Sequence, residues 1–451
     1  MLPCAHDGWV QMGNSSYERC NACPHASPGY PRSMSVSLAF SGLLWAALCS
    51  SGPPSPCPYV TTVAGGPAYC GPFQSWQYLY PQGISDSGFW AGYRWQCGDN
   101  DSHTMAIAWT PGGGVRSLPV PAGTEDSVAW GINSSGTAVG YGYTTSGGAA
   151  PGHWASFVWP AGGGWLEIPV SVPVTAAYAF AVNNAGWVVG QATLQPGAVS
   201  SAPFVWKDGQ LTVIDPAQFG KTSGIARGVS DTGFVAGTVG SAETVAGRVF
   251  RWKGGSTVVL SPLQGATNSF ARTVNNHGEV AGGCRFPAAT PLGWVFRPTW
   301  WDQDGMPHEL QLPLGCTNGA CTSLDDTGLK FGFANSPSTP TKYCIWIADQ
   351  PYDLYELGLT PNQVGAAMAM NQRGQIVGYG AIPDTQAGSA WIVTPTGVPA
   401  DLNRDRVVDG ADLVELLQMW GPVESSPADF NRDGVVDGTD LGLLLGSWTA
   451  Q

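Results

Sequence analysis

The feature that most limits the fold is a short motif that recurs along most of the chain. The copy at residues 181–190 reads AVNNAGWVVG, and the other copies align with it on the glycine that follows the Asn/Asp pair. These glycines are Gly88, Gly136, Gly186, Gly233, Gly278, Gly328 and Gly374, at intervals of 48, 50, 47, 45, 50 and 46 residues. Seven copies at this period predict a repeat protein in which each copy is one structural unit.

Each unit is predicted to contain four short β-strands. In the third copy they fall at residues 179–182, 187–193, 202–206 and 211–214, separated by turns rich in Asn, Asp and Gly. A single four-stranded antiparallel sheet cannot bury both of its faces, so successive sheets are expected to stack around an axis. The chain is therefore predicted to be mainly β, with a seven-bladed β-propeller over residues 51–398 and a small all-α domain over residues 399–451.

The last repeat is too short to complete its own blade. No fourth strand follows residues 389–394, whereas a strand-like run at residues 59–63 precedes the first repeat. We expect residues 59–63 to pair beside residues 389–394, which closes the ring and removes two exposed sheet edges.

Two sets of side chains recur at fixed places in the repeat. Carboxylates at the turn, Asp86, Asp231, Asp325 and Asp326, are interpreted as turn formers rather than a catalytic pair. A tryptophan near the end of the third strand is interpreted as packing between blades, with stacking on sugar rings as the alternative. These residues are Trp109, Trp159, Trp206, Trp252, Trp300 or Trp301, Trp346 and Trp391.

The repeat has the pattern [IV]-[NS]-x-x-G-x-x-[VA]-G, followed by A/P-F-V-W and a glycine turn. This pattern resembles the HAF extracellular repeat of bacterial secreted proteins over roughly three quarters of the chain. The resemblance implies an exported repeat protein and says almost nothing about activity. Two units depart from the pattern, because residues 297–299 interrupt one and residues 324–326 replace the Asn pair of the other.

Residues 1–50 precede the repeats and are predicted to be a leader with a secretory signal. An apolar run at residues 36–48 follows Arg32, as in a signal peptide, and a short buried helix is the alternative. Met34 is the expected start of the working precursor. A lipidated Cys49 remains a less favoured alternative because Leu48 suits that processing poorly.

Cysteine usage is consistent with export. Cys57 with Cys70 and Cys316 with Cys321 are expected to form local disulfides in an oxidising compartment. The Cys20 and Cys23 pair resembles half of a zinc site whose second half is missing.

The composition argues against nucleic-acid binding and against a membrane-spanning segment. Charged residues make up 11% of the chain and the net charge is −13, so a nucleic-acid-binding surface is not expected. No uncharged apolar run reaches the ~18 residues of a membrane span. The protein is therefore expected to be secreted or associated with the cell surface, without a transmembrane segment.

The C-terminal residues carry a duplicated motif. Residues 401–420 and 429–448 are offset by 28 positions and share 13 identities. Oxygen-bearing groups recur at positions 1, 3, 5, 7, 9 and 12 of a twelve-residue loop, with a backbone carbonyl at position 7, which is the spacing that wraps a calcium ion. The predicted ligands of two calcium ions are Asp401, Asn403, Asp405, Val407, Asp409 and Asp412, and Asp429, Asn431, Asp433, Val435, Asp437 and Asp440.

The two loops differ from the usual calcium loop and from each other. Position 12 is Asp rather than Glu in both, and position 6 is Arg406 in the first loop but Gly434 in the second. The first site is therefore expected to be weaker or more strained. Residues 401–451 contain ten acidic and three basic side chains, so folding is expected to require the cation.

A calcium loop followed by one helix and then duplicated resembles the type I dockerin domain. The resemblance implies a cohesin partner that contacts loop positions 10 and 11, which are Gly410 and Ala411 in one half and Gly438 and Thr439 in the other. The alternative is a calcium-stabilised C-terminal cap or cell-surface anchor without a cohesin.

Three classes of function remain open. The favoured one is a secreted, non-enzymatic binding or scaffolding propeller, because the six histidines are scattered and no hydrolase motif is present. The second is a glycoside hydrolase or polysaccharide lyase with a dockerin anchor, for which a polysaccharide would be the substrate. The third is a purely structural surface protein. A glycosidase needs two carboxylates about 5–10 Å apart, and the sequence does not place Asp126, Asp302 and Glu309 relative to each other.

Overall fold

The computed structural model divides the chain into two compact units, Met1–Ser55 and Pro56–Gln451. Of the first unit it describes one hairpin, β1 (Trp9–Met12) and β2 (Ser16–Arg19). The predicted signal segment, Met34 and Cys49 lie outside the described residues. The second unit is described from residue 59 onward except for residues 64–67, 71–74, 78, 97–102, 146–151, 196, 198, 241–246, 291–292, 338, 348, 355–364, 381–388, 396–399, 403–407, 424–425, 427, 431–434, 447 and 449–451.

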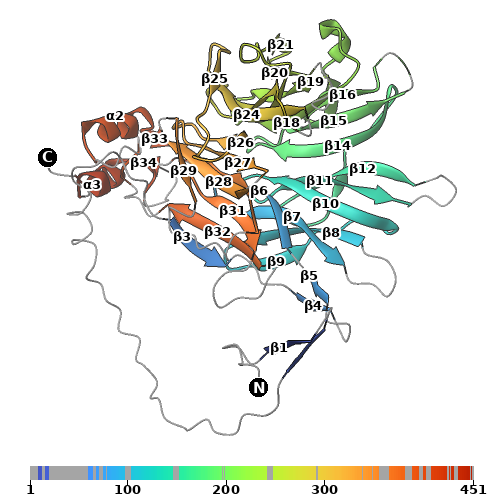
Figure 1. The fold of residues 1–451 in the computed structure, drawn as a ribbon, viewed down its shortest axis with the longest axis horizontal. Helices are drawn as coiled ribbons and strands as arrows, with labels where there is room; N and C mark the ends of the chain where they lie inside the picture. The colour runs from blue at the N-terminus through green and yellow to red at the C-terminus, as the bar shows by residue number, and fades with distance from the viewer. Residues whose placement is uncertain are drawn as a thin grey trace. The chain divides into compact units, whose positions relative to one another are not determined.

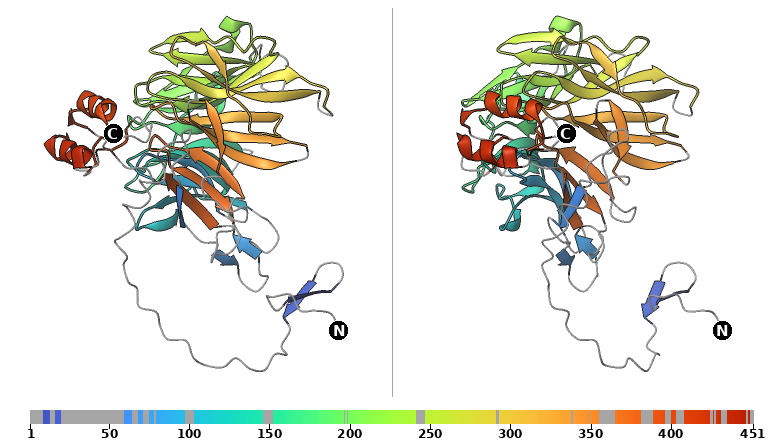
Figure 2. Two further views of the ribbon diagram at one scale, coloured as in Figure 1. Left: turned by 60° about the vertical axis from the view of Figure 1, so that its left-hand side comes forward. Right: turned by 90° about the vertical axis from the view of Figure 1, so that its left-hand side faces the viewer.

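The second unit contains the predicted seven-bladed β-propeller (Figure 1), built from seven four-stranded antiparallel sheets. Figure 2 shows from two further sides how successive sheets stack face to face.

Blade 1 is β6 (Leu79–Ile84), β7 (Trp90–Gln96), β8 (His103–Thr110) and β9 (Gly114–Ser117); blade 2 is β10 (Thr124–Ile132), β11 (Ala138–Thr144), β12 (His153–Trp159) and β13 (Leu166–Glu167); blade 3 is β14 (Val174–Val182), β15 (Val188–Leu194), β16 (Ser201–Lys207) and β17 (Gln210–Val213); blade 4 is β18 (Gly224–Val229), β19 (Val235–Val239), β20 (Arg248–Lys253) and β21 (Ser256–Val259). Blade 5 is β22 (Asn268–Val274), β23 (Val280–Pro287), β24 (Trp294–Trp301) and β25 (Pro307–Glu309); blade 6 is β26 (Asn318–Leu324), β27 (Lys330–Ser336), β28 (Thr339–Ile347) and β29 (Gln350–Asp353); blade 7 is β30 (Ala366–Met370), β31 (Ile376–Gly380), β32 (Ser389–Pro395) and β3 (Tyr59–Val63). A short hairpin of β4 (Ala68–Cys70) and β5 (Ser75–Gln77) precedes blade 1, and a single turn of 3-10 helix, η2 (Pro216–Phe219), follows blade 3.

Blade 7 confirms the predicted closure of the ring. The N-terminal strand β3 pairs antiparallel with β32, from Tyr59 opposite Pro395 to Val63 opposite Trp391. The first strand of the repeat region thus supplies the outer strand of the last blade. The two ends of the repeat region, which are distant in sequence, are thus joined by the pairing of β3 with β32. This pairing covers the outer edge of β32 and closes the ring between blades 7 and 1.

The repeated turn connects the first two strands of each blade. In blade 3, the Gly186 N–H donates to Asn183 O at 3.0 Å and the Asn183 N–H to Trp187 O at 3.1 Å. This is a three-residue hairpin loop whose last residue is left-handed, so glycine is required there. All seven aligned glycines have positive φ, between 68° and 87°.

A second glycine of the motif is required for a different reason. In every blade the first strand contains a β-bulge, in blade 3 between Ala179 and Ala181, where it pairs with the second strand at Gly190. A Cβ on Gly190 would collide with the carbonyl oxygen of Tyr178, because the bulge brings that backbone close. The equivalent glycines Gly92, Gly140, Gly237, Gly282, Gly332 and Gly378 each face a backbone carbonyl of the neighbouring strand in the same way.

The recurring tryptophans pack between blades. Trp159, Trp301 and Trp346 are wholly buried, and each indole N–H donates to a carbonyl at the end of the preceding blade, at 2.6–2.7 Å. Trp301, not Trp300, occupies the equivalent register. Trp391 is buried too, but it lies opposite Gly378, and Val393 takes its place opposite Ile376.

Residues 297–299 depart from the repeat's sequence pattern, yet the third strand of blade 5 is continuous, since β24 runs through Pro298, whose carbonyl accepts the Leu310 N–H at 2.9 Å. In blade 3 the carbonyl of Pro203 likewise accepts the Ile214 N–H, at 2.9 Å. The residue at this place in the third strand acts as an acceptor toward the fourth strand, so a proline fits there.

Cys316 and Cys321 are both thiols and form no disulfide with each other. Cys321 lies within β26 and is buried among Ala334 and Trp346, with its Sγ 3.5 Å from Ser323 O, while Cys316 lies in the turn before the strand. Burial raises the pKa of the Cys321 thiol to about 12, which makes it unreactive. The expected pair of Cys57 and Cys70 lies outside the residues whose side chains are described.

The C-terminal residues have an apolar cluster of their own. It joins Leu402, Val408, Leu416, Val436 and Leu444 with Ala400 and Ala428. Two short helices contribute to it, α2 (Gly410–Gln418) and α3 (Gly438–Gly446), and β33 (Gly421–Pro422) pairs with β34 (Val435–Val436). Across the described residues, no helix is long and apolar enough to cross a membrane.

The glycine requirement is testable by one substitution. Gly190→Ala places a methyl group against Tyr178 O and should lower the free energy of unfolding by about 2–3 kcal/mol, measured by urea denaturation. Gly162→Ala, at an exposed turn with open space around it, should change it by less than about 0.5 kcal/mol. Equal effects of the two substitutions would contradict the assignment.

Candidate functional site

The predicted calcium loops end at the helices α2 and α3, where the structure describes their last positions. Asp409 caps α2, and its Oδ1 accepts the Ala411 N–H at 2.7 Å. Asp412 is completely buried, and its two oxygens accept the N–H of Leu402 at 2.6 Å and of Asp409 at 2.9 Å. The position-12 carboxylate thus holds both ends of its loop.

The second copy repeats this arrangement. The oxygens of the completely buried Asp440 accept the N–H of Phe430 at 2.8 Å and of Asp437 at 3.0 Å, and Asp437 Oδ1 accepts the Thr439 N–H at 2.7 Å. Each of these bonds lies 28 residues after its counterpart. The two motifs therefore fold alike where they are described.

The donor set fits a hard cation as far as it is described. Asp412 and Asp440 place a carboxylate at the same position of both loops, and carboxylate and carbonyl oxygens are the ligands of Ca²⁺. Asp401, Asp429 and Val435 are also described and are partly buried, while Asn403, Asp405, Val407, Asn431 and Asp433 lie outside the described residues. Within the described part of the loops, no three metal-binding side chains form a group.

The predicted partner positions lie at the start of each helix. Gly410, Ala411, Gly438 and Thr439 are all exposed on the first turns of α2 and α3. Beyond them, large apolar side chains are exposed at equivalent places, Leu417 and Leu445 in the helices at 51% each, and Trp420 and Trp448 just after the helix ends at 47% and 41%. We call these four residues the apolar helix face. Exposed apolar residues at matching places in both repeats indicate a contact surface.

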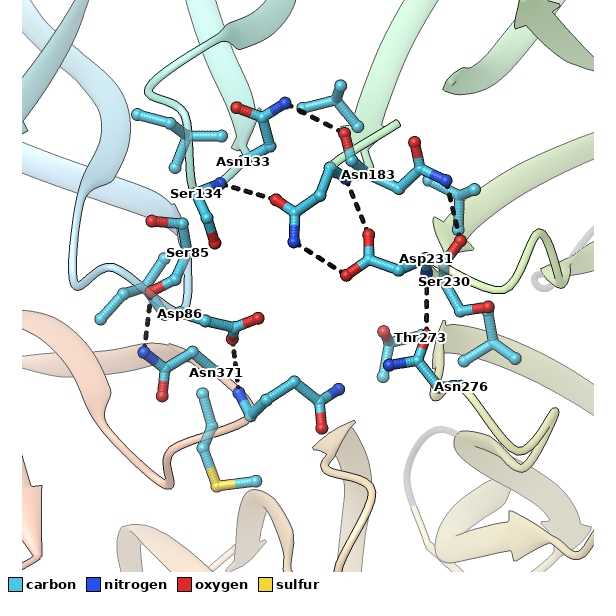
Figure 3. A pocket seen from close by; sticks show the side chains of 18 of the residues that line it. Ser85, Asp86, Asn133, Ser134, Asn183, Ser230, Asp231, Thr273, Asn276 and Asn371 are labelled. Atoms are coloured by element: carbon cyan, nitrogen blue, oxygen red, sulfur yellow. Dashed lines mark hydrogen bonds between the residues drawn. The ribbon is translucent and has the colours of Figure 1, made fainter. Parts of the chain in front are cut away.

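A second candidate site lies on the propeller axis, where the seven repeated turns meet (Figure 3). The first turn residue of each blade accepts an N–H within its own turn through its side chain, as Asn183 Oδ1 does from Trp187 at 2.8 Å. Except at Ser134, the side chain of the second turn residue accepts the backbone N–H of the second turn residue in the preceding blade. We call these second residues the axial ring: Asp86, Ser134, Asn184, Asp231, Asn276, Asp326 and Gln372.

The axial ring connects consecutive blades all the way round. Six of its backbone N–H groups donate to the side chain of the next ring residue, at 2.6–2.9 Å. Ser134 is too short to accept across the remaining interface, and there Ser87 Oγ donates to Ser134 O at 3.0 Å. The interpretation of Asp325 as a turn former holds, since it accepts three bonds within its own turn, whereas Asp86, Asp231 and Asp326 also join blades.

All the ring residues except Asp326 line a pocket of about 140 Å³ at this end of the axis. The two carboxylate oxygens of Asp231 accept the backbone and side-chain N–H groups of Asn184, at 2.7 and 2.8 Å. Those of Asp326 accept the same two groups of Asn276, at 2.8 Å each. In the axial ring, Asp86 accepts the Gln372 N–H through Oδ1 at 2.9 Å. Burial raises the pKa of Asp86 from 3.8 to about 6, and the charges of Asp231 and Asp326 act in the same direction, against the Gln372 N–H and the charge of Arg373.

The carboxylates singled out from the sequence do not form one site. Asp126 lies at the start of β10 in blade 2 and accepts the N–H and hydroxyl of Thr104, at 2.7 and 3.0 Å. Asp302 and Glu309 belong to the outer hairpin of blade 5, where they contact His308 and Arg297 at 2.8 Å each. Each of these carboxylates therefore has a local partner, and blade 2 is separated from blade 5 by two blades.

Sequence reasoning missed two arginines on the axis. Arg227 and Arg272 occupy the same place in their repeats, three residues before Ser230 and Asn275 of the turns. The repeat alignment could have singled them out as two consecutive cations at one position of a chain with only 19 Lys and Arg.

Comparisons with known proteins concern the propeller. No protein-family model and no curated protein sequence matches the chain. Among solved structures it is similar to the β-propeller domain of the Trilobed protease from Pyrococcus furiosus, with a TM-score of 0.44 and 9% identity over 70% of this chain and 93% of that chain. It is also similar to virginiamycin B lyase from Staphylococcus aureus, with a TM-score of 0.40 and 12% identity over 74% and 99% of the two chains.

A third similar structure is the Pyrococcus horikoshii acylaminoacyl peptidase, with a TM-score of 0.35 and 11% identity over 62% of this chain. The matched part spans 52% of that peptidase, about half of its length. At these identities the likeness concerns the fold alone.

Replacing Asp86 tests the electrostatics of the ring. Its pKa of about 6 in the folded protein exceeds the ordinary 3.8, so wild-type stability should fall as pH rises from about 4 to about 6 and remain lower above. Asp86→Asn keeps an acceptor for Gln372 and removes the charge. The variant should lack this step and be more stable at pH 7 by about 1–2 kcal/mol, measured by urea unfolding at several pH values.

Asp231→Asn is the matched control. It has one acceptor oxygen where Asn184 donates two bonds, so it should destabilise the protein by about 1 kcal/mol at pH 7. Stabilisation by Asp231→Asn, or a wild-type pH step that persists in Asp86→Asn, would contradict this account.

Proposed function

We propose that the protein is a secreted, calcium-binding protein whose propeller is a binding or scaffolding module. Its C-terminal residues 401–451 act as a docking module of the type I dockerin kind, which tethers the propeller to a cohesin-like partner at the cell surface. The observation that carries the proposal is the duplicated arrangement around Asp412 and Asp440.

The arrangement supports ion binding because a fully buried carboxylate is costly unless positive charge or hydrogen bonds compensate it. The side chains that would hold the two ions are Asp401, Asn403, Asp405, Asp409 and Asp412, and their counterparts 28 residues later, with the carbonyls of Val407 and Val435. The ions would supply positive charge to a segment with ten acidic and three basic residues. Asp412 and Asp440 would hold the two ends of each loop together, as their hydrogen bonds do.

The docking half rests on the apolar helix face. Leu417, Trp420, Leu445 and Trp448 expose about half of their surfaces at places related by the internal repeat. Two equivalent surfaces of this kind suit a partner that can bind either one. Small residues at Gly410, Ala411 and Gly438 leave the helix starts open to close approach.

The binding or scaffolding role of the propeller is favoured over catalysis by the use made of its axial carboxylates. Asp231 and Asp326 are held between blades by two hydrogen bonds each, which fixes them in a structural role. The low charged fraction of 11% and the apolar run at residues 36–48 support export.

Calcium uptake is the first test. Isothermal titration of the full chain should show two ions bound, and Asp412→Ala and Asp440→Ala should each remove one. The ion lost in Asp440→Ala should be the tighter one, since Gly434 lies at position 6 of that loop and Arg406 in the other. Glu415→Gln, in the same helix but outside the loops, should keep both. No heat of binding in the wild type would end the proposal.

Docking is tested separately with purified type I cohesin modules on a sensor surface. The full chain should bind in calcium and dissociate in a chelator, and a single Leu417→Glu or Leu445→Glu change should leave one usable surface. The double variant should bind at least about tenfold more weakly. Calcium uptake without binding to any module would instead favour a calcium-stabilised cap.

A further inference from the structure

The β-bulges single out one residue on the inner strand of every blade. In each of the strands β6, β10, β14, β18, β22, β26 and β30, one residue at the same place before the turn is skipped in the pairing with the next strand, and β10 and β14 have a second bulge near their other ends. These strands surround the axis, because the turns at their ends meet in the axial pocket. The skipped residues are Gln82, Trp130, Phe180, Arg227, Arg272, Thr322 and Met368.

Four consecutive bulge residues form a contiguous arc around the axis. The rings of Trp130 and Phe180 meet edge to face with centroids 5.7 Å apart. The guanidinium carbon of Arg227 lies 4.3 Å from the centroid of Phe180. The next bulge residue, Arg272, is adjacent, because the backbone of Gly228 lies directly against that of Thr273, and its charge lowers the pKa of Arg227. Contacts therefore pass from blade to blade, from two aromatic rings to two adjacent cations.

The two cations lack a carboxylate partner. None of the ion pairs among the described residues includes Arg227 or Arg272. Burial lowers the pKa of Arg227 to about 10, assisted by the charge of Arg272, and burial lowers the pKa of Arg272 too. Both remain charged at neutral pH, and two like charges side by side destabilise the folded state.

Arg227 is half-buried and Arg272 keeps an exposed surface, although burial desolvates both guanidinium groups. The acidic axial ring lies three to four residues further along each strand, roughly 10 Å away, so its carboxylates do not offset these charges.

Aromatic side chains extend the arc. Tyr141 lies 5.2 Å from Tyr178, 6.0 Å from Phe180 and 6.4 Å from Trp130 between ring centroids, and Trp154 lies 5.7 Å from Tyr141. Trp154 is 37% exposed, so the aromatic group reaches solvent. Such rings offer flat, partly apolar surfaces against which another ring can stack.

We propose that this arc of the inner strands binds a carboxylate-bearing ring compound, with the carboxylate between Arg227 and Arg272 and the ring against Trp130, Phe180 and Tyr141. An arginine pair without a carboxylate partner among the described residues matches a ligand carboxylate, because the planar guanidinium donates paired hydrogen bonds to its two oxygens. The anion also relieves the repulsion between the two cations. The ring is either an acidic sugar or an aromatic acid, since both combine a flat face with a carboxylate.

This inference rests on the propeller half of the proposed function and is independent of its calcium half. It names the ligand class of the binding module from residues 130–272 alone. Calcium uptake and docking can therefore fail while it stands, and it can fail while they stand.

Titration of the full chain with defined probes tests the site. Glucuronate and benzoate are the acidic sugar and aromatic acid, glucose and benzyl alcohol are their neutral counterparts, and acetate is an anion without a ring. At least one acidic ring compound should quench tryptophan fluorescence saturably and bind at least about tenfold more tightly than its neutral counterpart and acetate. The tighter of the two acids identifies the source. No saturable binding of either acid up to about 10 mM would overturn the proposal.

Substitutions separate a binding role from a structural one. Arg227→Gln and Arg272→Gln should each weaken binding at least about tenfold, while Arg227→Lys should retain part of the affinity through its charge. The Gln variants should not lower the melting temperature, because they remove like-charge repulsion. Arg116→Gln, on the outer strand β9 of blade 1, should change neither property. Unaltered affinity in both Gln variants, or equal weakening in Arg116→Gln, would overturn the assignment.

Discussion

The structure depends on a hydrogen bond that each blade donates to the next at the axis. Seven hairpin turns converge there, and their backbone N–H groups point toward neighbouring blades rather than toward a strand that could pair with them. Six of these N–H groups donate to a side chain of the next blade, and each such hydrogen bond contributes about 0.5–1.5 kcal/mol. Asn184, for example, accepts from Ser134 and donates to Asp231, so one residue connects three consecutive blades.

This arrangement decides where a ligand finds room. At the end of the axis occupied by the ring, side-chain oxygens such as those of Asp231 and Asp326 already accept hydrogen bonds. Further along the inner strands the bulges remove one residue per blade from the pairing, and its side chain is not required by the ring. Different residue types occupy these equivalent positions, with aromatic residues at Trp130 and Phe180 and cations at Arg227 and Arg272. Unequal residues at equivalent positions of a repeat are typical of function, whereas equal ones, like the turn glycines, are typical of folding.

The sequence was sufficient for those parts of the fold that repeat locally. The period, the four strands, the left-handed glycine of each turn and the pairing of residues 59–63 with the last blade are confirmed, because a turn motif and a missing strand are visible without knowledge of distant contacts. The need for Gly190 was not visible, since it arises from a bulge in the neighbouring strand. The disulfide expected for Cys321 was wrong for the same reason, because the burial of a thiol within a strand is a property of the sheet. For the calcium loops the spacing placed Asp412 and Asp440 at equivalent places, while the apolar helix face and the arginine pair emerge only from exposure and from contacts between blades.

The central claim is that the axial ring is a cooperative part of the fold rather than a set of independent turns. Native-state hydrogen exchange of the ring amides tests it most directly, followed for Ser134, Asn184, Asp231, Asn276, Asp326 and Gln372. If the ring joins all blades, these amides become accessible only when the propeller unfolds, and their protection free energies should agree with one another and with the global free energy of unfolding. Exchange of single ring amides by local opening, at free energies well below the global value and different from blade to blade, would contradict the account.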